Sequence, residues 1–322
     1  MSVTVRDIAK VAGVSVGTVS RALKNQPGMT EDTRKQIRQI AKSLGYDFDR
    51  LQSEPIRRIA FLLHRQHNTL TANPFFSAVL HGAEDACRQS DASLSFLAVG
   101  PADPVMAQLS RHEVDALLCV GFFEPELLQL LKQAGKPMVL VDQWSMDFAC
   151  VNPDNETGGY LVTRHLLESG RRRIAFLASS LAHYSIRQRE RGYRRALFEA
   201  KVLADPALDV IAPPGVDVET GMALAMQQLL ALPERPDAIF AYNDAAALIA
   251  LRICQEAGLS VPGDIAIVGF DDIEMAALSN PPLSTVAVDK ALLGRRGVEL
   301  LVQRATPGEE IVPVELVLRS SS

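Results

Sequence analysis

Apolar residues near the N-terminus recur at helical spacing on both sides of Gly13: Ile8, Ala9, Val11, Ala12, Val19, Ala22 and Leu23. The pattern predicts two short helices within Val5–Leu23, because side chains three and four positions apart share a helix face. Gly13 is suited to end the first helix, and Ser15 is suited to cap the second. This is the pattern of a helix-turn-helix, whose second helix enters the major groove of DNA. Spacing alone fits an ordinary helical hairpin equally well.

A third helix is predicted after the turn signal Pro27-Gly28, with Thr30 as its N-cap. Apolar residues repeat at helical spacing up to Gly45: Ile37, Ile40, Ala41 and Leu44. Three helices around one small core make an all-α headpiece, which we place at residues 1–46.

Beyond residue 58, short apolar runs alternate with longer segments of helical periodicity. The runs suited to buried strands are Ile59–Leu63, Leu94–Val99, Ala116–Val120, Met138–Val141, Ile174–Ala178, Ala238–Tyr242 and Ile265–Phe270. The helical segments include Phe75–Ser90, Glu156–Ser169, Arg187–Ala200, Val218–Leu230 and Ala245–Ala257. The alternation predicts parallel sheets with helices on both faces. The number of strands and helices is larger than one doubly wound sheet normally holds. We therefore expect two α/β lobes with a ligand in the cleft between them.

Charge is divided unevenly along the chain. Residues 1–58 contain 11 of the 33 Lys and Arg and 6 of the 38 Asp and Glu in the chain of 322 residues. The head is therefore +5 and the remainder −10, although the whole chain is only −5. A basic head on an acidic body suits a head that meets DNA phosphates and a body that does not.

Composition narrows the remaining function classes. Hydrophobic residues make up 48% and charged residues 22% of the chain, and no apolar run approaches the ~18 residues of a membrane span. MSVTVRDIAK contains no apolar signal core, so we expect a cytoplasmic protein. The cysteines are far apart and lack the spacing of a zinc site: Cys87, Cys119, Cys150 and Cys254. We expect them to be buried free thiols, and we expect neither a bound metal nor a cofactor. Hydrolase, phosphate-loop and metalloprotease motifs are missing, so no enzyme is expected.

The residue string of the first two helices is more specific than their spacing. D-I-A-x-x-A-G-V-S-x-x-T-V-S-R-x-L closely resembles the headpiece of the lac-repressor (LacI/GalR) family of bacterial transcription regulators. The resemblance continues through the body, in N-P-F-F at 73–76, G-R-x-R-I-A-F-L at 170–177, R-x-x-G-Y at 189–193, G-F-D-D at 269–272 and P-P-L-S-T-V at 281–286. It implies a type I periplasmic-binding-protein-like effector domain of two α/β lobes, a homodimer and operator DNA as partner.

For the headpiece, the resemblance implies that Val16 and Gly17 set operator preference and that Arg21 reads guanine. Val16 and Gly17 are small and nearly apolar, so they are suited to touching a thymine methyl group. Phosphate contacts, which fix register without reading sequence, are expected from the short polar and basic residues of the same helix: Ser15, Thr18, Ser20 and Lys24. For each polar residue, a solvated helix face is the alternative.

The linker at residues 47–57 departs from the family pattern. The family usually shows Y-x-P-x-x-x-A-R-x-L, a hinge helix whose leucine wedges into the minor groove. This chain reads Y-D-F-D-R-L-Q-S-E-P, which lacks that proline and the A-R-x-L, and Leu51 is the one available wedge. We therefore expect a plain flexible linker.

For the body, the resemblance places effector-binding residues on both lobes: Phe75, Phe76, Asp142, Arg189, Asn243 and Asp271. Trp144 and Ser185 are added because they lie close in sequence to Asp142 and Arg189, respectively. The aromatic rings are suited to stacking on a ring face, and the polar groups to bonding hydroxyls. Core packing is the alternative for the phenylalanines, and helix capping for Asp142 and Asp271. Val216 and Val288 replace aromatic and polar residues found in other members.

We therefore expect a DNA-binding regulator, usually a repressor, controlled by a neutral hydroxylated ligand such as a sugar. The lobes are expected at about 58–153 plus 287–305 and at 154–286 plus 306–322. A sugar-binding transport-type protein without a DNA role is the alternative. The basic head and the missing signal core argue against it.

Overall fold

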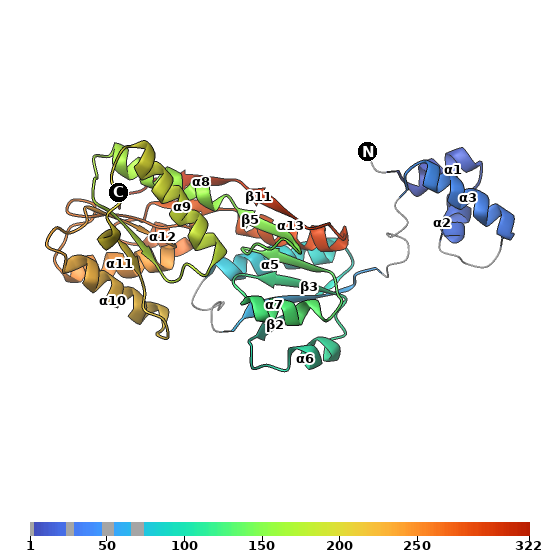
Figure 1. Cartoon of the computed structure of the whole chain (residues 1–322), viewed down its shortest axis with the longest axis horizontal. Helices are drawn as coiled ribbons and strands as arrows, with labels where there is room; N and C mark the ends of the chain where they lie inside the picture. The colour runs from blue at the N-terminus through green and yellow to red at the C-terminus, as the bar shows by residue number, and fades with distance from the viewer. Residues whose placement is uncertain (1–2, 24–28, 47–54, 66–73) are drawn as a thin grey trace. The chain divides into compact units, whose positions relative to one another are not determined.

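The chain forms two compact units that divide between Pro55 and Ile56, and each is described by itself. The structure is a computed structural model that describes residues 3–23, 29–46, 55–65 and 74–322 (Figure 1). The expected linker falls largely on residues 47–54, outside the described residues, as does Leu51.

The first unit contains the three predicted helices, α1 (Val5–Ala12), α2 (Val16–Leu23) and α3 (Glu31–Ser43). Side chains from all three bury one small core: Ile8, Ala9, Val19, Ala22, Leu23, Ile37 and Ala41. Thr4 begins α1 in a capping box with Asp7, and Gly13 ends it with a φ of 65°. The periodicity thus predicted the three helices and these core residues, but Val11, which it also placed on the apolar face, is 60% exposed.

In the second unit, six parallel strands form the sheet of the first lobe. Their order is β11 (Gly308–Val312), β5 (Ala149–Pro153), β4 (Met138–Val141), β3 (Ala116–Val120), β1 (Arg58–His64) and β2 (Ser93–Val99). One face packs against α5 (Pro74–Gln89) and α13 (Lys290–Val302). The other face packs against α6 (Val105–Arg111) and α7 (Pro125–Lys132).

The second lobe has a parallel four-stranded sheet. Its order is β7 (Asp209–Ile211), β6 (Ile174–Ala178), β8 (Ala238–Ala241) and β9 (Ala266–Val268). α8 (Asn155–Glu168) and α9 (Tyr184–Glu199) cover one face, and α10 (Val218–Leu230) and α11 (Asp244–Glu256) the other (Figure 1). The short 3-10 turn Pro206–Leu208 precedes β7, and α12 (Glu274–Leu278) follows β9.

The chain passes between the lobes three times. The crossings lie between β5 and α8, between β10 (Thr285–Val288) and α13, and between β11 and β12 (Val314–Val317). β10 and β12 pair antiparallel beside the second lobe. β11 corrects the expected lobe boundary, since residues 306–322 were all placed in the second lobe, whereas β11 pairs with β5 in the first.

Two glycines let α8 and α9 pack closely. A Cβ atom on Gly159 would lie 2.2 Å from the carbonyl oxygen of Arg189, and one on Gly192 would lie 2.0 Å from that of Glu156. Any side chain at either position would separate the helices. This contact therefore fixes the backbone at Arg189, one of the expected effector-binding residues.

Candidate ligand cavity and nucleic-acid interface

A cavity of about 790 Å³ lies between the two lobes of the second unit. It is formed by segments that follow the carboxyl ends of β4, β6, β7, β8 and β9, together with the start of α5. Seven of the eight expected effector-binding residues line it: Phe75, Phe76, Asp142, Ser185, Arg189, Asn243 and Asp271. The strand ends thus bring together side chains that are up to 196 positions apart in the chain.

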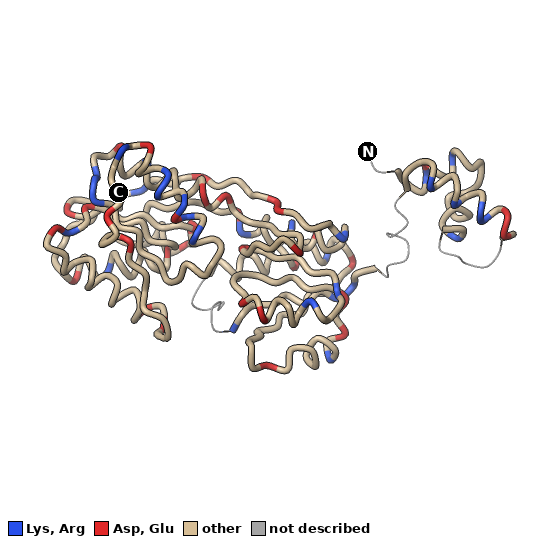
Figure 2. Tube along the Cα trace, in the orientation of Figure 1, with Lys and Arg blue, Asp and Glu red and all other residues tan. Residues whose placement is uncertain are grey.

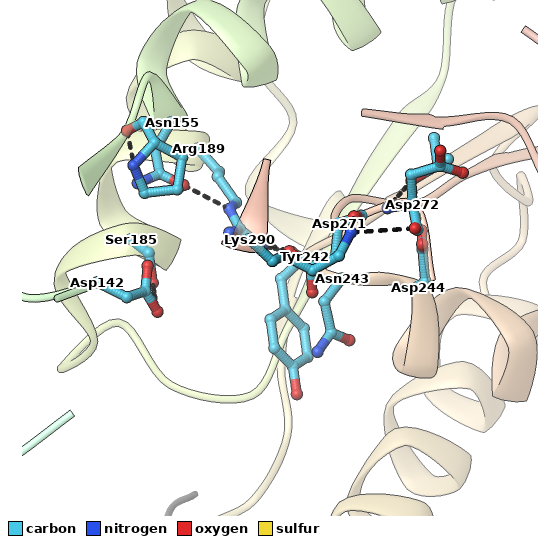
Figure 3. A network of polar contacts seen from close by, with 12 residues as sticks. Asp142, Asn155, Ser185, Arg189, Tyr242, Asn243, Asp244, Asp271, Asp272 and Lys290 are labelled. Carbon is cyan, nitrogen blue, oxygen red and sulfur yellow. Dashed lines mark hydrogen bonds and ion pairs between the residues drawn. The ribbon is translucent and has the colours of Figure 1, made fainter. Parts of the chain in front are cut away.

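Arg189, on α9, is the most heavily held side chain of the cavity (Figure 3). Its Nε donates to Oδ1 of Asn155 at 2.9 Å, and its Nη1 donates to the carbonyl oxygen of Tyr242. Its Nη2 lies 3.4 Å from Oδ1 of Asp271, and its guanidinium lies 3.7 Å above the Phe270 ring. Held on all sides, the guanidinium has one fixed position against which a ligand binds.

Asp142 lines the cavity from the first lobe. It directly follows β4 and has a φ of 59°. The Ser185 hydroxyl donates to its Oδ2 at 3.4 Å, a contact that joins the lobes. Its buried Oδ1 has no hydrogen-bond donor among the described residues. An unsatisfied buried acceptor is costly, so Oδ1 is the atom that gains most from a ligand hydroxyl.

The other lining residues serve the fold as well as the cavity. Asn243 caps α11, because its Oδ1 accepts from the Ala246 amide at 2.9 Å, which leaves the side-chain NH₂ group for other partners. Phe75 and Phe76 are buried and meet edge to face at 5.3 Å, so core packing and cavity lining both apply to them.

Trp144 requires a correction, because it does not belong to the cavity lining. It is 44% exposed and stacks on Tyr184 of α9 with ring centroids 6.4 Å apart. The Tyr184 hydroxyl in turn donates to Glu309 of β11 at 2.8 Å. Trp144 therefore packs against the second lobe through Tyr184 and lies outside the residues that line the cavity.

Apart from Val216, sequence reasoning missed the wall that follows β7. This wall is mostly apolar and consists of Ile211, Ala212, Pro213, Pro214, Gly215, Val216, Asp217, Val218, Gly221 and Met222. The Pro-Pro-Gly signal after an apolar run was the available clue. Ser179, Ser180, His183, Ile186 and Tyr242 complete the lining. Val288 is not one of the lining residues and is buried in β10.

Burial raises the pKa of three neighbouring carboxyl groups. The pKa of Asp142 rises to about 7, that of Asp244 to about 7 and that of Asp271 to about 6. The nearby Arg189 guanidinium opposes the rise at Asp142 and Asp271. These three groups therefore bind more protons in the folded domain than in the unfolded chain between about pH 4 and pH 7. Their contribution to the free energy of unfolding falls as pH rises through that window.

We expect Asp142→Asn to stabilise the ligand-free protein at pH 8 and to change its stability little at pH 4, where the Asp142 carboxyl is protonated in the folded protein and largely so in the unfolded chain. The amide removes the buried negative charge and supplies a donor, with a gain on the order of 1–3 kcal/mol. Thermal unfolding at the two pH values measures this, and the melting temperature should rise by ~2–4 °C per kcal/mol. An equal shift at both pH values would show that charge is not the cause. Surface Asp147→Asn is the matched control.

The exposed face of α2 carries the three expected base-contacting residues. Val16 is 46% exposed, and Gly17 and Arg21 are also exposed. Arg21 lies one turn after Gly17, whose carbonyl oxygen accepts from its Nε at 3.4 Å. None of the three residues belongs to the headpiece core, so this face of α2 is open to DNA, as a reading helix requires.

The expected phosphate-contacting residues divide into three cases. The Ser15 hydroxyl accepts from the Thr18 amide at 3.1 Å and bonds to the Thr18 hydroxyl at 2.8 Å, so Ser15 caps α2. Thr18 and Ser20 are half-buried at the edge of the exposed face. Lys24 lies outside the described residues. Figure 2 shows further lysine and arginine residues on the headpiece helices.

Comparisons with known proteins agree with both units. Residues 4–47 match the family described as bacterial regulatory proteins, lacI family, and residues 163–322 match a periplasmic binding protein-like domain. The HTH-type transcriptional repressor PurR of Aliivibrio salmonicida is 32% identical over 314 residues, covering 94% of this chain and 92% of that protein. The chain belongs to the LacI family. It is a DNA-binding transcriptional regulator, and the resemblance seen in its residue strings is confirmed.

Other members of the LacI family match over most of their length. The ribose operon repressor of Haemophilus influenzae is 32% identical, covering 94% of this chain and 91% of its own. Among solved structures, a complex of the transcriptional regulator CelR with cellobiose has a TM-score of 0.76 and 29% identity, covering 99% of this chain and all of that one. A lac repressor dimer bound to operator and the anti-inducer ONPF has a TM-score of 0.71 and 26% identity, with 100% and 99% covered. These relatives are regulators and not enzymes.

Proposed function

We propose that this chain is a repressor whose affinity for its operator is controlled by a neutral polyhydroxylated ligand of the sugar class. The supporting observation is the cavity between the lobes, where acceptors from Asp142 and Asp271 and donors from Arg189 and Asn243 surround a space bordered by Phe75 and Phe76. Fixed donors and acceptors beside an aromatic wall suit hydroxyl groups on a ring. CelR with cellobiose and a LacI-family regulator of Enterococcus faecium with ribose are relatives whose structures contain sugars.

On the DNA side, we assign base contacts to Val16, Gly17 and Arg21. Phosphate contacts are assigned to the remaining polar positions of the same region: Ser15, Thr18, Ser20 and Lys24. We further propose a homodimer acting in the cytoplasm, since two headpieces match the two half-sites of a palindromic operator. None of the helices that the described residues form is long and apolar enough to cross a membrane. The proposal gives the chain no catalytic step, and a transport role would leave the helix-turn-helix without use.

A thermal-shift screen of the full-length protein tests the ligand class. Ribose, cellobiose, adenosine and hypoxanthine are compared, because a ligand that binds only the folded state raises the melting temperature with concentration. We expect a sugar to raise it and the nucleoside and nucleobase to have no effect. A rise with adenosine or hypoxanthine alone would contradict the sugar class, and no rise with any sugar of a wider panel would contradict it equally.

Trp144 supplies an optical signal for the same event. It is the one tryptophan of the chain, and its stack on Tyr184 joins the two lobes. If the ligand shifts one lobe relative to the other, the solvent exposure of Trp144 changes and its emission changes with it. We expect saturable emission changes with the wild-type protein and none with Trp144→Phe. The variant should keep its ligand affinity within about twofold, because the indole lies outside the cavity. A loss of affinity of tenfold or more would place Trp144 on the ligand.

A further inference from the structure

The Asp271–Asp272 turn, at the end of the second-lobe sheet, has an unfavourable backbone conformation. Asp271 has a φ of 113° and Asp272 a φ of 51°, values that residues other than glycine adopt rarely. Asp271 is 3% exposed, and its carboxylate pairs with Arg189. Because such backbone conformations persist only when neighbours impose them, the groups that hold this turn also direct the Asp271 carboxylate.

Part of the turn is held by hydrogen bonds and an ion pair. They come from the second lobe and from β10, the strand after which the chain crosses to the first lobe. The Asp271 amide donates to the Val286 carbonyl at 2.8 Å, and the Asp272 amide donates to the Thr285 hydroxyl at 3.3 Å. Arg319 pairs with the Asp272 carboxylate at 2.7 Å. These contacts fix the amides and the second carboxylate but leave the two carbonyl oxygens.

Lys290 bonds both of those carbonyl oxygens. Its Nζ donates to the carbonyl of Asp271 and, at 3.1 Å, to that of Asp272 (Figure 3). Lys290 is the first residue of α13, which packs against α5 and the six-stranded sheet of the first lobe. The ammonium group therefore reaches from the start of a first-lobe helix to a second-lobe turn. Lys290 is not among the residues that line the cavity, so it acts through the turn.

We propose that Lys290 is a positioning residue that holds the Asp271–Asp272 turn and thereby couples the lobe arrangement to the orientation of the Asp271 carboxylate. This inference rests on the proposed ligand site at Asp271. A movement of α13 relative to the second lobe pulls on the two carbonyl groups and turns the carboxylate that faces Arg189. Conversely, a ligand that fixes Asp271 favours the lobe arrangement in which the Lys290 bonds are intact.

Three variants of the full-length protein test the coupling. Lys290→Met keeps the aliphatic stem and removes the donors, whereas Lys290→Arg keeps a cation with N–H donors. Lys132→Met is the matched control, because Lys132 pairs with Asp147 at 2.8 Å on the first lobe, away from the turn. Backbone hydrogen exchange is measured by mass spectrometry for the peptide covering residues 267–275 and, as a reference, for residues 174–178 of β6. Dissociation constants for ribose and cellobiose are measured on the same samples.

We expect Lys290→Met to speed exchange at residues 271–273 by about tenfold or more and to leave β6 within about twofold. The sugar that binds the wild type should bind about tenfold more weakly to Lys290→Met. Lys290→Arg should recover most of both effects, and Lys132→Met should show neither. If Lys290→Met does not fold, Lys290→Gln takes its place with the same directions.

Unchanged exchange at residues 271–273 in Lys290→Met, or equal acceleration there and in β6, would overturn the inference. An unchanged sugar affinity would overturn it too. So would a Lys290→Arg variant as impaired as Lys290→Met. If no sugar of the wider panel binds the wild-type protein, the proposed ligand class fails, while the exchange result still decides whether Lys290 holds the turn.

Discussion

Asp271→Asn should shift the response of operator binding to about 10–150-fold higher ligand concentration and leave ligand-free operator binding within about twofold of the wild type. The substitution keeps the size of the side chain but removes the charge that pairs with Arg189 at 3.4 Å in a buried setting. Arg189 then lacks its carboxylate partner from the second lobe, and the ligand loses a charged acceptor. Hydrogen bonds to charged groups contribute about 1.5–3 kcal/mol, so affinity should fall about 10–150-fold. Calorimetry with the ligand, and fluorescence anisotropy with operator, measure the two quantities separately.

Asp264→Asn is the matched control for this experiment. Asp264 lies on the same lobe and accepts hydrogen bonds from Ser260 at an exposed turn, outside the cavity lining. Its replacement should change neither quantity. Two results would argue against Asp271 as a ligand-binding group: an unchanged ligand affinity in Asp271→Asn, or an equal loss of ligand-free operator binding.

Arg21→Ala should weaken operator binding by about 1–3 kcal/mol and flatten base preference at one position of each half-site. Arg21 lies on the exposed face of α2, beside Gly17, and its guanidinium is the one long donor of that helix. A bidentate contact to guanine accounts for a loss of this size, whereas a phosphate contact would weaken all sequences alike. Anisotropy titrations on the operator and on single-base variants measure the loss at each position.

Lys42→Ala on α3 is the control, because it removes an exposed positive charge from the same headpiece without touching α2. It should weaken operator and random DNA by the same small factor. If Arg21→Ala behaves in the same way as Lys42→Ala, Arg21 holds the backbone and does not read a base.

The headpiece was predictable because its structure is local. Ile8, Val19 and Ile37 each lie on the apolar face of their own helix and meet in one core. Gly13 and Thr30 mark helix boundaries through their own backbone and side-chain chemistry. The residue string added what spacing could not, namely that this helical pair reads DNA.

Much of the cavity was predictable because strand ends reveal its position. Asn243 and Asp271 follow apolar runs, and strand ends in parallel sheets share one edge. The strand predicted at Ile265–Phe270 extends two residues beyond the end of β9, which ends at Val268. The chain then enters the turn at Asp271. Trp144 was misplaced because nearness in sequence to Asp142 does not fix direction after a residue with positive φ.

Long-range features could not be read from local patterns. β11 has the short, charged sequence GEEIV, which indicates neither a strand nor a lobe, and its partner β5 is about 160 residues earlier. Lys290 looks like an ordinary first residue of a helix, and only the three-dimensional arrangement shows its bonds to Asp271 and Asp272. Contacts of this kind depend on how the lobes are joined, which periodicity does not encode.

We propose that a cationic headpiece binds a specific DNA sequence under the control of a ligand between two lobes. The most direct measurement is fluorescence anisotropy of the full-length protein on a promoter fragment from beside its own gene, against a scrambled fragment, at two salt concentrations and with and without the sugar that raises its melting temperature. We expect the promoter fragment to bind at least tenfold more tightly than the scrambled fragment, to bind more weakly as salt rises, and to change its affinity when the sugar is added. Equal binding of the two fragments, or sequence-selective binding that the sugar leaves unchanged, would contradict it.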